Sequence, residues 1–468
     1  MPSTTTAFRH RSPALWLGLG AAAALLSVGA RFDLPLLAWA APVFLLRFSR
    51  RSAAALGLPV IAIVSTASVL WWMAALAVPV TPLVSVGGLA FGIAYTLPYV
   101  VDRLAAPRAN RWGRILLFPA ALMSVEFLLG TFGPFGTAYG LRAATQHDAN
   151  SLLQLTAITG PYAIAFLIGL SGSVLNTLWE EGRTRFAVRS TAALAAVLGL
   201  AVLGGQLRLG TAPTGADSVR VAGINPSRAA MDAETEIHGH SRLAVTDPRL
   251  VEHDAVTAAA PGVLDDLFAQ AARVADEEDV YLLTADLTYL PDAPHGRDET
   301  HFFGPDGRLL ATYEKARPIP GLEIYEPGDG VVPVVDTPHG RIATVICFDA
   351  DFPDLARIDA DILLVPGGDW PEMGRTHTGM AGLRAIENGY NLVRQDFNGQ
   401  SAAFDSYGRV LSTQDTTHDS GVWYADVPTA GTGSVYRAAG DVLAWLALIG
   451  TLAITVTAAA RPRDRRAS

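Results

Sequence analysis

The sequence predicts a polytopic α-helical membrane domain joined to one α/β domain that lies outside the membrane. Half of the 468 residues are hydrophobic and only 17% are charged. The apolar residues form long runs between about residues 12 and 208 and again near the C-terminus, whereas most acidic residues lie between about 215 and 428. We therefore divide the chain into a seven-span membrane domain (1–210), a water-soluble domain (215–430), a last span (438–460) and a basic tail (461–468).

Eight segments are predicted to span the membrane, because a helix needs about 20 mostly apolar residues to cross the hydrocarbon core. The second segment is short and contains Pro35 and Pro42, so a tilted or re-entrant segment stays open there. The eight segments are 13–30, 34–48, 54–75, 82–102, 114–131, 152–178, 188–207 and 438–460.

The arginines predict the orientation of these spans. They gather before the first span, in alternate loops and in the C-terminal tail, while the other loops are nearly free of cations. Basic loops stay on the cytoplasmic side. With eight spans, both termini are therefore expected to be cytoplasmic and the 215–430 domain extracytoplasmic. The acidic soluble domain, which has no glycine-rich phosphate loop, argues against a nucleic-acid partner.

The soluble domain alternates strand and helix patterns, which is typical of a layered α/β domain. Apolar residues at helical spacing predict a helix over 262–276 and another over 377–390. Short apolar or alternating runs predict strands at 218–224, 280–284, 342–347, 361–365, 391–397, 401–405 and 410–413, with a hairpin over 301–313.

The only cysteine, Cys347, and the only lysine, Lys315, lie close together in this domain. A lone cysteine is often a small buried hydrophobe. Here, however, it closes a buried strand before the polar turn FDADFPD. Nucleophiles are held at such elbows, where the next backbone N–H is free to bind an oxyanion. A lysine ammonium, unlike an arginine fork, can be aimed at one atom. The pair therefore predicts nucleophilic catalysis by a thiol.

No cofactor or metal is expected. His238 and His240, with Glu234 and Glu236 nearby, are the best metal-like cluster in the sequence. No third ligand group stands at zinc-like spacing, so a solvated loop is the favoured interpretation.

Three stretches resemble the nitrilase (carbon–nitrogen hydrolase) superfamily. YEKARPIPGLE resembles its lysine motif, and VICFDADFPDLAR is similar to its cysteine elbow. GLRAIENGYNLVRQDFNGQSAAFDSYGRVL, with Arg384 and Glu387, resembles the stretch that follows. Seven apolar spans, such a domain and an eighth span are similar to the layout of the apolipoprotein N-acyltransferase family. The resemblance implies an αββα sandwich and a bacterial-type inner (cytoplasmic) membrane location.

The resemblance also implies roles for single residues. Cys347 would be the nucleophile of a Glu–Lys–Cys triad and would carry the acyl group as a thioester. Lys315 and the backbone N–H of Phe348 would stabilise the oxyanion, and Glu323 would support the triad. A phospholipid would donate the acyl group, and the N-terminal amine of a lipoprotein would accept it. Nothing in the sequence requires more than a monomer in the bilayer.

The sequence departs from the family pattern at the general base. Asp254 stands where the family has a glutamate, and its carboxylate is one methylene shorter, a difference of roughly 1 Å that can cost about a hundredfold in rate. Glu252 lies two residues earlier on the same strand face and is an alternative base.

Asp349 is the second departure, because the acyltransferases commonly have Tyr–Glu after the cysteine, whereas soluble amidases have an aromatic residue followed by Asp. Three interpretations follow. They are a membrane N-acyltransferase, a membrane-tethered nitrilase-type amidase, and a catalytically impaired homologue with a binding role.

Overall fold

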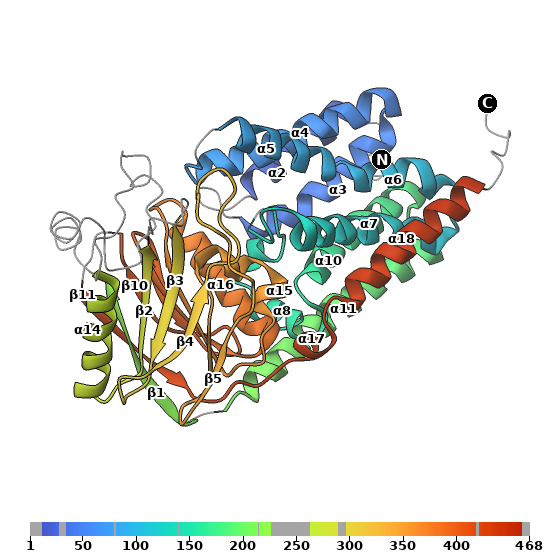
Figure 1. Cartoon of the computed structure of the whole chain (residues 1–468). Helices are drawn as coiled ribbons and strands as arrows, with labels where there is room; N and C mark the ends of the chain where they lie inside the picture. Colours follow the sequence, from blue (N-terminus) through green and yellow to red (C-terminus); the bar gives the residue numbers. More distant parts are fainter. Residues whose placement is uncertain are drawn as a thin grey trace. The chain divides into compact units, whose positions relative to one another are not determined.

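The computed structural model describes residues 12–27, 34–78, 81–138, 140–213, 215–225, 263–288, 296–417 and 421–460. The chain forms two compact units, whose elements are labelled in Figure 1. The helical unit comprises Met1–Gly133, Tyr139–Thr211 and Ala439–Ser468, and the α/β unit comprises Pro134–Ala138 and Ala212–Ala438.

Apolar helices make up the helical unit, as the sequence predicts. Among the described residues, six helices are long and apolar enough to span a membrane: Ala54–Ala75, Pro82–Arg108, Arg111–Phe132, Tyr162–Glu181, Arg185–Gly210 and Val442–Ala460. The polytopic membrane domain is thereby confirmed. Two further helices lie at the first two predicted spans: α2 (Pro13–Leu26) ends before the predicted 13–30, whereas α3 (Pro35–Arg51) runs beyond the predicted 34–48. With 14 and 17 residues, both are shorter than the six helices above. The number of crossings therefore stays a prediction.

Local capping explains where several of these helices begin. The Thr81 hydroxyl caps α5 (Pro82–Ala94) by accepting a bond from the Val84 N–H, and Asn110 and Thr184 cap α7 (Arg111–Phe132) and α11 (Arg185–Gly210) in the same way. Such side-chain acceptors satisfy N–H groups that have no partner within the helix.

The sixth predicted span, 152–178, begins later than expected. Its first residues form the short helices α8 (Asn150–Leu153) and α9 (Thr156–Thr159), and α10 starts only at Tyr162 and ends at Glu181. Gly160, with a φ of 72°, interrupts the helix before Pro161. A left-handed residue cannot continue a right-handed helix.

Ion pairs and a hydrogen bond connect the C-terminal ends of three helices in the helical unit. Arg50, near the end of α3, forms a 2.7 Å pair with Asp102 of α6 (Leu97–Ala105). Arg47 of α3 lies 3.4 Å from Glu180 at the end of α10. Arg103 donates to the Arg50 carbonyl at 3.1 Å. The C-terminal ends of α3, α6 and α10 therefore lie together.

The described part of the α/β unit contains three sheets. A six-stranded sheet has the order β10-β9-β8-β7-β6-β5, in which β6, β7 and β8 are parallel. A three-stranded antiparallel sheet has the order β2-β3-β4, and β1 pairs with β11. The strands are β1 (Ser218–Asn225), β2 (Leu282–Thr288), β3 (Arg297–Phe303), β4 (Leu309–Glu314), β5 (Val334–Thr337), β6 (Gly340–Thr344), β7 (Ile362–Gly368), β8 (Asn391–Phe397), β9 (Gln400–Phe404), β10 (Val410–Asp415) and β11 (Gly421–Pro428).

Two hydrophobic cores separate the layers of this unit. Leu363 and Leu392 of the six-stranded sheet pack with Ala381 of α16 (Gly374–Asn388) on one face. Ile362, on the other face, packs with residues of the smaller sheets such as Phe302. Helix α14 (Val263–Glu277) covers the outer side of β3 through Ala271, Ala275 and Phe303. The order helix, sheet, sheet, helix is the expected αββα sandwich (Figure 1).

Candidate active site

Cys347 lies at a tight elbow beyond the end of β6. The strand was expected to reach the cysteine, but β6 ends at Thr344, and Cys347 begins the short 3₁₀ turn η3 (Cys347–Asp351). Its φ is +46°, and its side chain is almost fully buried. A left-handed conformation at a non-glycine residue costs on the order of 1–3 kcal/mol and is typical of functional sites. The elbow thus holds the thiol in a strained but defined position.

The end of β7 lies directly against this elbow. A Cβ atom placed on Gly367 would lie 2.9 Å from Cβ and 3.2 Å from Sγ of Cys347. The thiol also lies 4.0 Å from the Gly368 carbonyl oxygen. Position 367 therefore has to be glycine for the nucleophile to occupy its place.

Lys315 follows β4 and has no exposed surface. Its Nζ donates to Oε1 of Glu323 at 2.7 Å and lies 3.4 Å from Oδ2 of Asp298. Burial lowers the pKa of Lys315, but the charges of Glu323 and Asp298 outweigh burial and raise it well above its ordinary value. Lys315 is therefore an ammonium ion, as an oxyanion-stabilising residue must be.

Glu323 supports this lysine in two ways. One carboxylate oxygen binds the ammonium, and the other accepts a 2.8 Å hydrogen bond from the Ile319 N–H. The Glu323 carboxylate thereby fixes the position of the loop after Lys315 relative to the Lys315 ammonium. Asp298 was not identified from the sequence; burial, partly offset by Lys315, raises its pKa to about 7.

Asp349 joins the cysteine elbow to the lysine loop. Its carboxylate accepts hydrogen bonds from the Tyr313 hydroxyl at 2.7 Å, the Ala316 N–H at 3.2 Å and the Arg317 N–H at 2.8 Å. Burial raises its pKa to about 6, while Lys315 and these donors lower it. The Phe348 N–H lies between Cys347 and Asp349 in the same turn. Asp349 thus positions the cysteine elbow and the lysine loop relative to each other.

The thiol itself is a weak acid in this environment. Burial raises the pKa of Cys347 to about 12, although the nearby charges of Lys315 and Arg394 lower it. At neutral pH the cysteine is therefore a neutral thiol, and a base has to remove its proton before it attacks.

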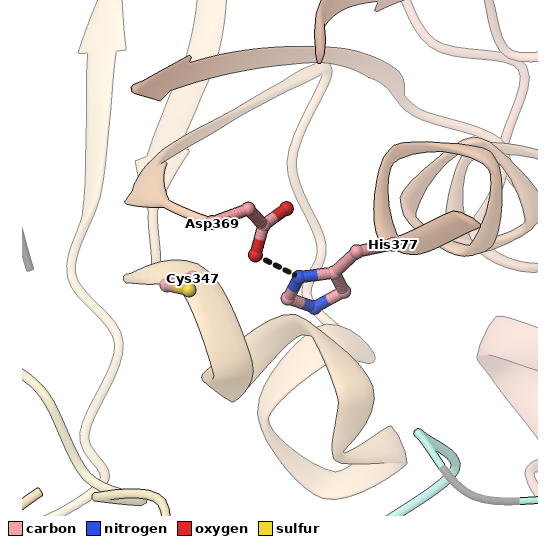
Figure 2. A group of neighbouring side chains, drawn as sticks. All are labelled: Cys347, Asp369 and His377. Atoms are coloured by element: carbon pink, nitrogen blue, oxygen red, sulfur yellow. Dashed lines mark hydrogen bonds and ion pairs between the residues drawn. The ribbon is translucent and has the colours of Figure 1, made fainter. Parts of the chain in front are cut away.

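A second set of buried polar side chains lies near the thiol, and Figure 2 shows two of them, Asp369 and His377, beside Cys347. His377 of α16 forms two hydrogen bonds of 2.8 Å, through Nδ1 to Asp369 and through Nε2 to Asp351. Arg394 of β8 donates to Asp369 at 2.9 Å. This His377 cluster (His377, Asp351, Asp369 and Arg394) was missed in the sequence. Its one signal is that His377 and Arg384, seven residues apart, share one face of a largely buried helix.

Two groups of described residues have donor atoms close enough to share a metal ion: Cys347, Asp369 and His377, and Asp286, Glu299 and His301. The first does not fit a cation, because both ring nitrogens of His377 already bind carboxylates and the Arg394 guanidinium lies 3.0 Å from Nδ1. In the second, His301 pairs with Asp286 at 3.2 Å.

The predicted bases, Asp254 and Glu252, lie outside the described residues, as do His238 and His240. The described part brings together Cys347, Lys315 and Glu323, with Phe348 and Asp349 in the connecting turn. Arg384 and Glu387, which the motif also includes, form a buried 2.8 Å ion pair on α16.

An αββα sandwich with a thiol at a strand-end elbow and a buried ammonium near it defines a cysteine-dependent enzyme of the carbon–nitrogen hydrolase class. The carbon–nitrogen hydrolase family model matches residues 232–437, and the model of the apolipoprotein N-acyltransferase N-terminal domain matches residues 21–174. The chain belongs to the apolipoprotein N-acyltransferase family, a membrane-bound branch of that class.

Relatives match most of the chain. An apolipoprotein N-acyltransferase of Geobacter metallireducens is 27% identical over 425 residues, which cover 80% of this chain and 81% of the relative. Another from Caulobacter vibrioides is 26% identical over 436 residues, covering 81% and 78%. Among solved structures, an amidase from Nesterenkonia sp. is 18% identical with a TM-score of 0.37, covering 47% of this chain and 93% of the amidase.

Proposed function

We propose that this chain transfers a fatty acyl group from a phospholipid, through a thioester on Cys347, to the N-terminal amine of a lipoprotein. Membership of the apolipoprotein N-acyltransferase family supports the reaction class. The observation that carries the proposal is the strained Cys347 elbow with a buried, charged Lys315 nearby, in a chain that also has apolar helices long enough to span a membrane.

In the first step, Asp254 takes the proton of the Cys347 thiol, and Sγ attacks the ester carbonyl carbon of the phospholipid. The oxyanion that forms is stabilised by the Lys315 ammonium and the Phe348 N–H. The carbon–oxygen ester bond then breaks, and the leaving alkoxide of the lysophospholipid takes the proton from Asp254. The elevated pKa of the thiol, about 12, explains why a base is needed.

In the second step, the lipoprotein amine attacks the thioester carbonyl carbon, and Asp254 takes a proton from the amine nitrogen. The same two donors stabilise the second oxyanion. The carbon–sulfur bond breaks, Cys347 leaves as a thiolate, and the proton returns to it. The products are an N-acylated lipoprotein and the free enzyme, and no other reactant is consumed.

We place the chain in a bacterial-type inner (cytoplasmic) membrane as a monomer, with both termini cytoplasmic and the α/β unit extracytoplasmic. The ion pairs Arg50–Asp102 and Arg47–Glu180 support this orientation, because they bring together the C-terminal ends of three helices that the eight-span topology places on the arginine-rich side. Basic residues near helix ends favour the cytoplasmic face.

The intact mass of the purified full-length protein tests the proposal, measured after incubation with phospholipid, with and without neutral hydroxylamine, and beside Cys347→Ala. We expect a mass gain of one fatty acyl chain that hydroxylamine removes and that Cys347→Ala lacks. A synthetic lipopeptide with a free N-terminal amine should then remove the same group from the enzyme.

An unmodified mass after incubation with phospholipid would contradict the proposal. Release of ammonia from a small amide would then identify the chain as an amidase, and the absence of both reactions would identify an impaired homologue. If the thioester forms but the acyl group is not transferred to the lipopeptide, the phospholipid would stand as the acyl donor, and the lipoprotein amine would be ruled out as the acceptor.

A further inference from the structure

The His377 cluster connects the turn after the nucleophile with the strand that faces it. Asp351 is the last residue of η3, four positions after Cys347, and Asp369 directly follows β7. All members are at most 4% exposed. A ring nitrogen of His377, a carboxylate oxygen of Asp369 and Sγ of Cys347 lie within 4.8 Å of one another. The cluster therefore lies beside the thiol as well as beneath its elbow.

The bonding pattern favours a charged His377. An ionised carboxylate can only accept hydrogen bonds, so the 2.8 Å contacts of Nδ1 with Asp369 and of Nε2 with Asp351 favour a hydrogen on each ring nitrogen, although the Arg394 guanidinium also lies 3.0 Å from Nδ1. A ring with hydrogens on both nitrogens is an imidazolium ion. Burial and Arg394 lower the pKa of His377, but Asp369 and Asp351 outweigh them and raise it to about 9.

The charges of the four residues of the His377 cluster balance when His377 is an imidazolium. Asp351 and Asp369 are negative, whereas His377 and Arg394 are positive. Burial and the neighbouring Asp369 raise the pKa of Asp396 well above its usual range, although Arg394 lowers it, so the neutral form of this carboxyl group is favoured. The charged groups that face His377 are Asp351 of η3, Asp369 directly after β7 and Arg394 of β8; on its own helix, Arg384 pairs with Glu387 instead.

We propose that His377 is a positioning residue for Cys347, which ties Asp351 of the elbow to Asp369 directly after β7 and compensates their negative charge beside the thiol. The inference rests on the proposed function only in taking Cys347 as the nucleophile. Without the imidazolium, the Asp369 carboxylate, which lies within 4.8 Å of a sulfur atom that has to become negative, would have one cation fewer beside it. Asp351 is held at its other end as well, because its carbonyl oxygen accepts bonds from the Thr137 N–H at 2.8 Å and hydroxyl at 2.7 Å.

Alkylation of the full-length protein by iodoacetamide tests this inference without any substrate. Cys347 is the only cysteine, so a single mass increment reports its reaction. At pH 8, well below the pKa of the thiol, the rate falls about tenfold for each unit by which that pKa rises. We expect His377→Gln to lower the alkylation rate at least about tenfold.

A double variant separates charge compensation from packing. His377→Gln with Asp351→Asn removes the cation together with one carboxylate, so the rate should recover to within about threefold of the native rate. His301→Gln is the matched control, because His301 also pairs with a buried aspartate in this unit but packs with Phe268 of α14. This control should keep the native rate, and the melting temperature of each variant shows whether it is folded.

Three outcomes would overturn the inference. They are an unchanged rate in His377→Gln, an equal loss in the single and double variants, and protection of the native thiol by micromolar Zn²⁺ that His377→Gln abolishes. The last outcome would identify a metal site. A p-nitrophenyl fatty ester, which acylates the thiol with release of nitrophenol, provides a second rate. Because neither probe requires phospholipid, a failed acyl transfer from lipid leaves this inference testable.

Discussion

Tyr313 donates a 2.7 Å hydrogen bond to Asp349, and this bond connects the end of β4 to the cysteine elbow. The two residues are 36 positions apart, and both are buried. The carboxylate also binds the Ala316 and Arg317 N–H groups, so one side chain fixes the loop that carries Lys315 relative to Cys347.

Asp349→Asn should therefore impair catalysis although it leaves the three residues of the triad unchanged. The amide retains one acceptor but directs its NH₂ group at backbone N–H donors, which leaves buried donors unpaired at a cost of about 1–3 kcal/mol. We expect thioester formation to slow by at least tenfold. Tyr313→Phe leaves the two backbone bonds intact and should cost less. Equal rates in the native protein and Asp349→Asn would contradict the positioning role.

Gly367→Ala should displace the nucleophile. The new methyl group would lie 2.9 Å from the Cys347 Cβ, so the thiol or β7 has to move. A misplacement of about 1 Å costs roughly a hundredfold, and we expect a loss of that size in the single-turnover rate of thioester formation. Gly379→Ala is the control, because a Cβ atom there meets nothing within 4 Å on the exposed side of α16. A native rate in Gly367→Ala would show that the elbow adapts.

Lys315→Arg should inactivate the protein although it retains the charge. The site has no exposed surface, and the ammonium lies 2.7 Å from Glu323, so the broader guanidinium cannot occupy the same point. Arginine also delivers its charge over a planar fork rather than to one atom. We expect thioester formation to fall by at least about a hundredfold, as in Lys315→Met. Activity close to native in Lys315→Arg would show that charge alone is sufficient.

Substitution at position 254 identifies the base. Asp254→Asn removes proton transfer, which contributes typically 10²–10⁴-fold to rate, and should lower both thioester formation and transfer to the lipopeptide. Asp254→Glu restores the family residue and should retain or increase activity. Glu252→Gln should leave the rate unchanged; if it alone abolishes activity, the base is Glu252.

Stability should depend on pH through His377. Its pKa is raised from 6.5 to about 9 in the folded protein, so the folded state binds its proton more tightly than the unfolded chain. The stabilising contribution is complete below pH 6.5 and is lost as pH rises through about 9. The melting temperature of the native protein in detergent should therefore exceed that of His377→Gln by several degrees at pH 6. This difference should shrink by pH 10, and a constant difference would contradict the ionisation.

Local patterns were sufficient to predict much of the fold. Apolar runs located helices such as Arg111–Phe132, because a bilayer imposes length and composition on each segment. Alternation likewise located β1 and the hairpin β3–β4. The pairing of β1 with β11 joins Ser218 to Pro428 and left no local signal, since it depends on how distant strands meet.

The residues of the site likewise fall into those that local sequence predicted and those that only the packing of distant elements brings together. Cys347, Lys315 and Glu323 stand in contiguous motifs, so their sequence context revealed them. The contacts of His377 with Asp351 and Asp369 depend on how α16 packs against the sheet, and neither spacing nor residue type predicted them. Asp298 approaches Lys315 only because β3 and β4 are paired.

Because the chain has a single lysine, chemical labelling of that lysine can report local opening of the protein around it. Because Lys315 has no exposed side chain, an amine-reactive reagent can modify the folded protein only at the N-terminal amine unless the loop around Lys315 opens. The labelling rate at that one position would measure the local opening free energy in the membrane-embedded protein. Such an experiment requires no engineered probe, because all other residues in the Lys+Arg count are arginines and no second lysine side chain competes for the reagent.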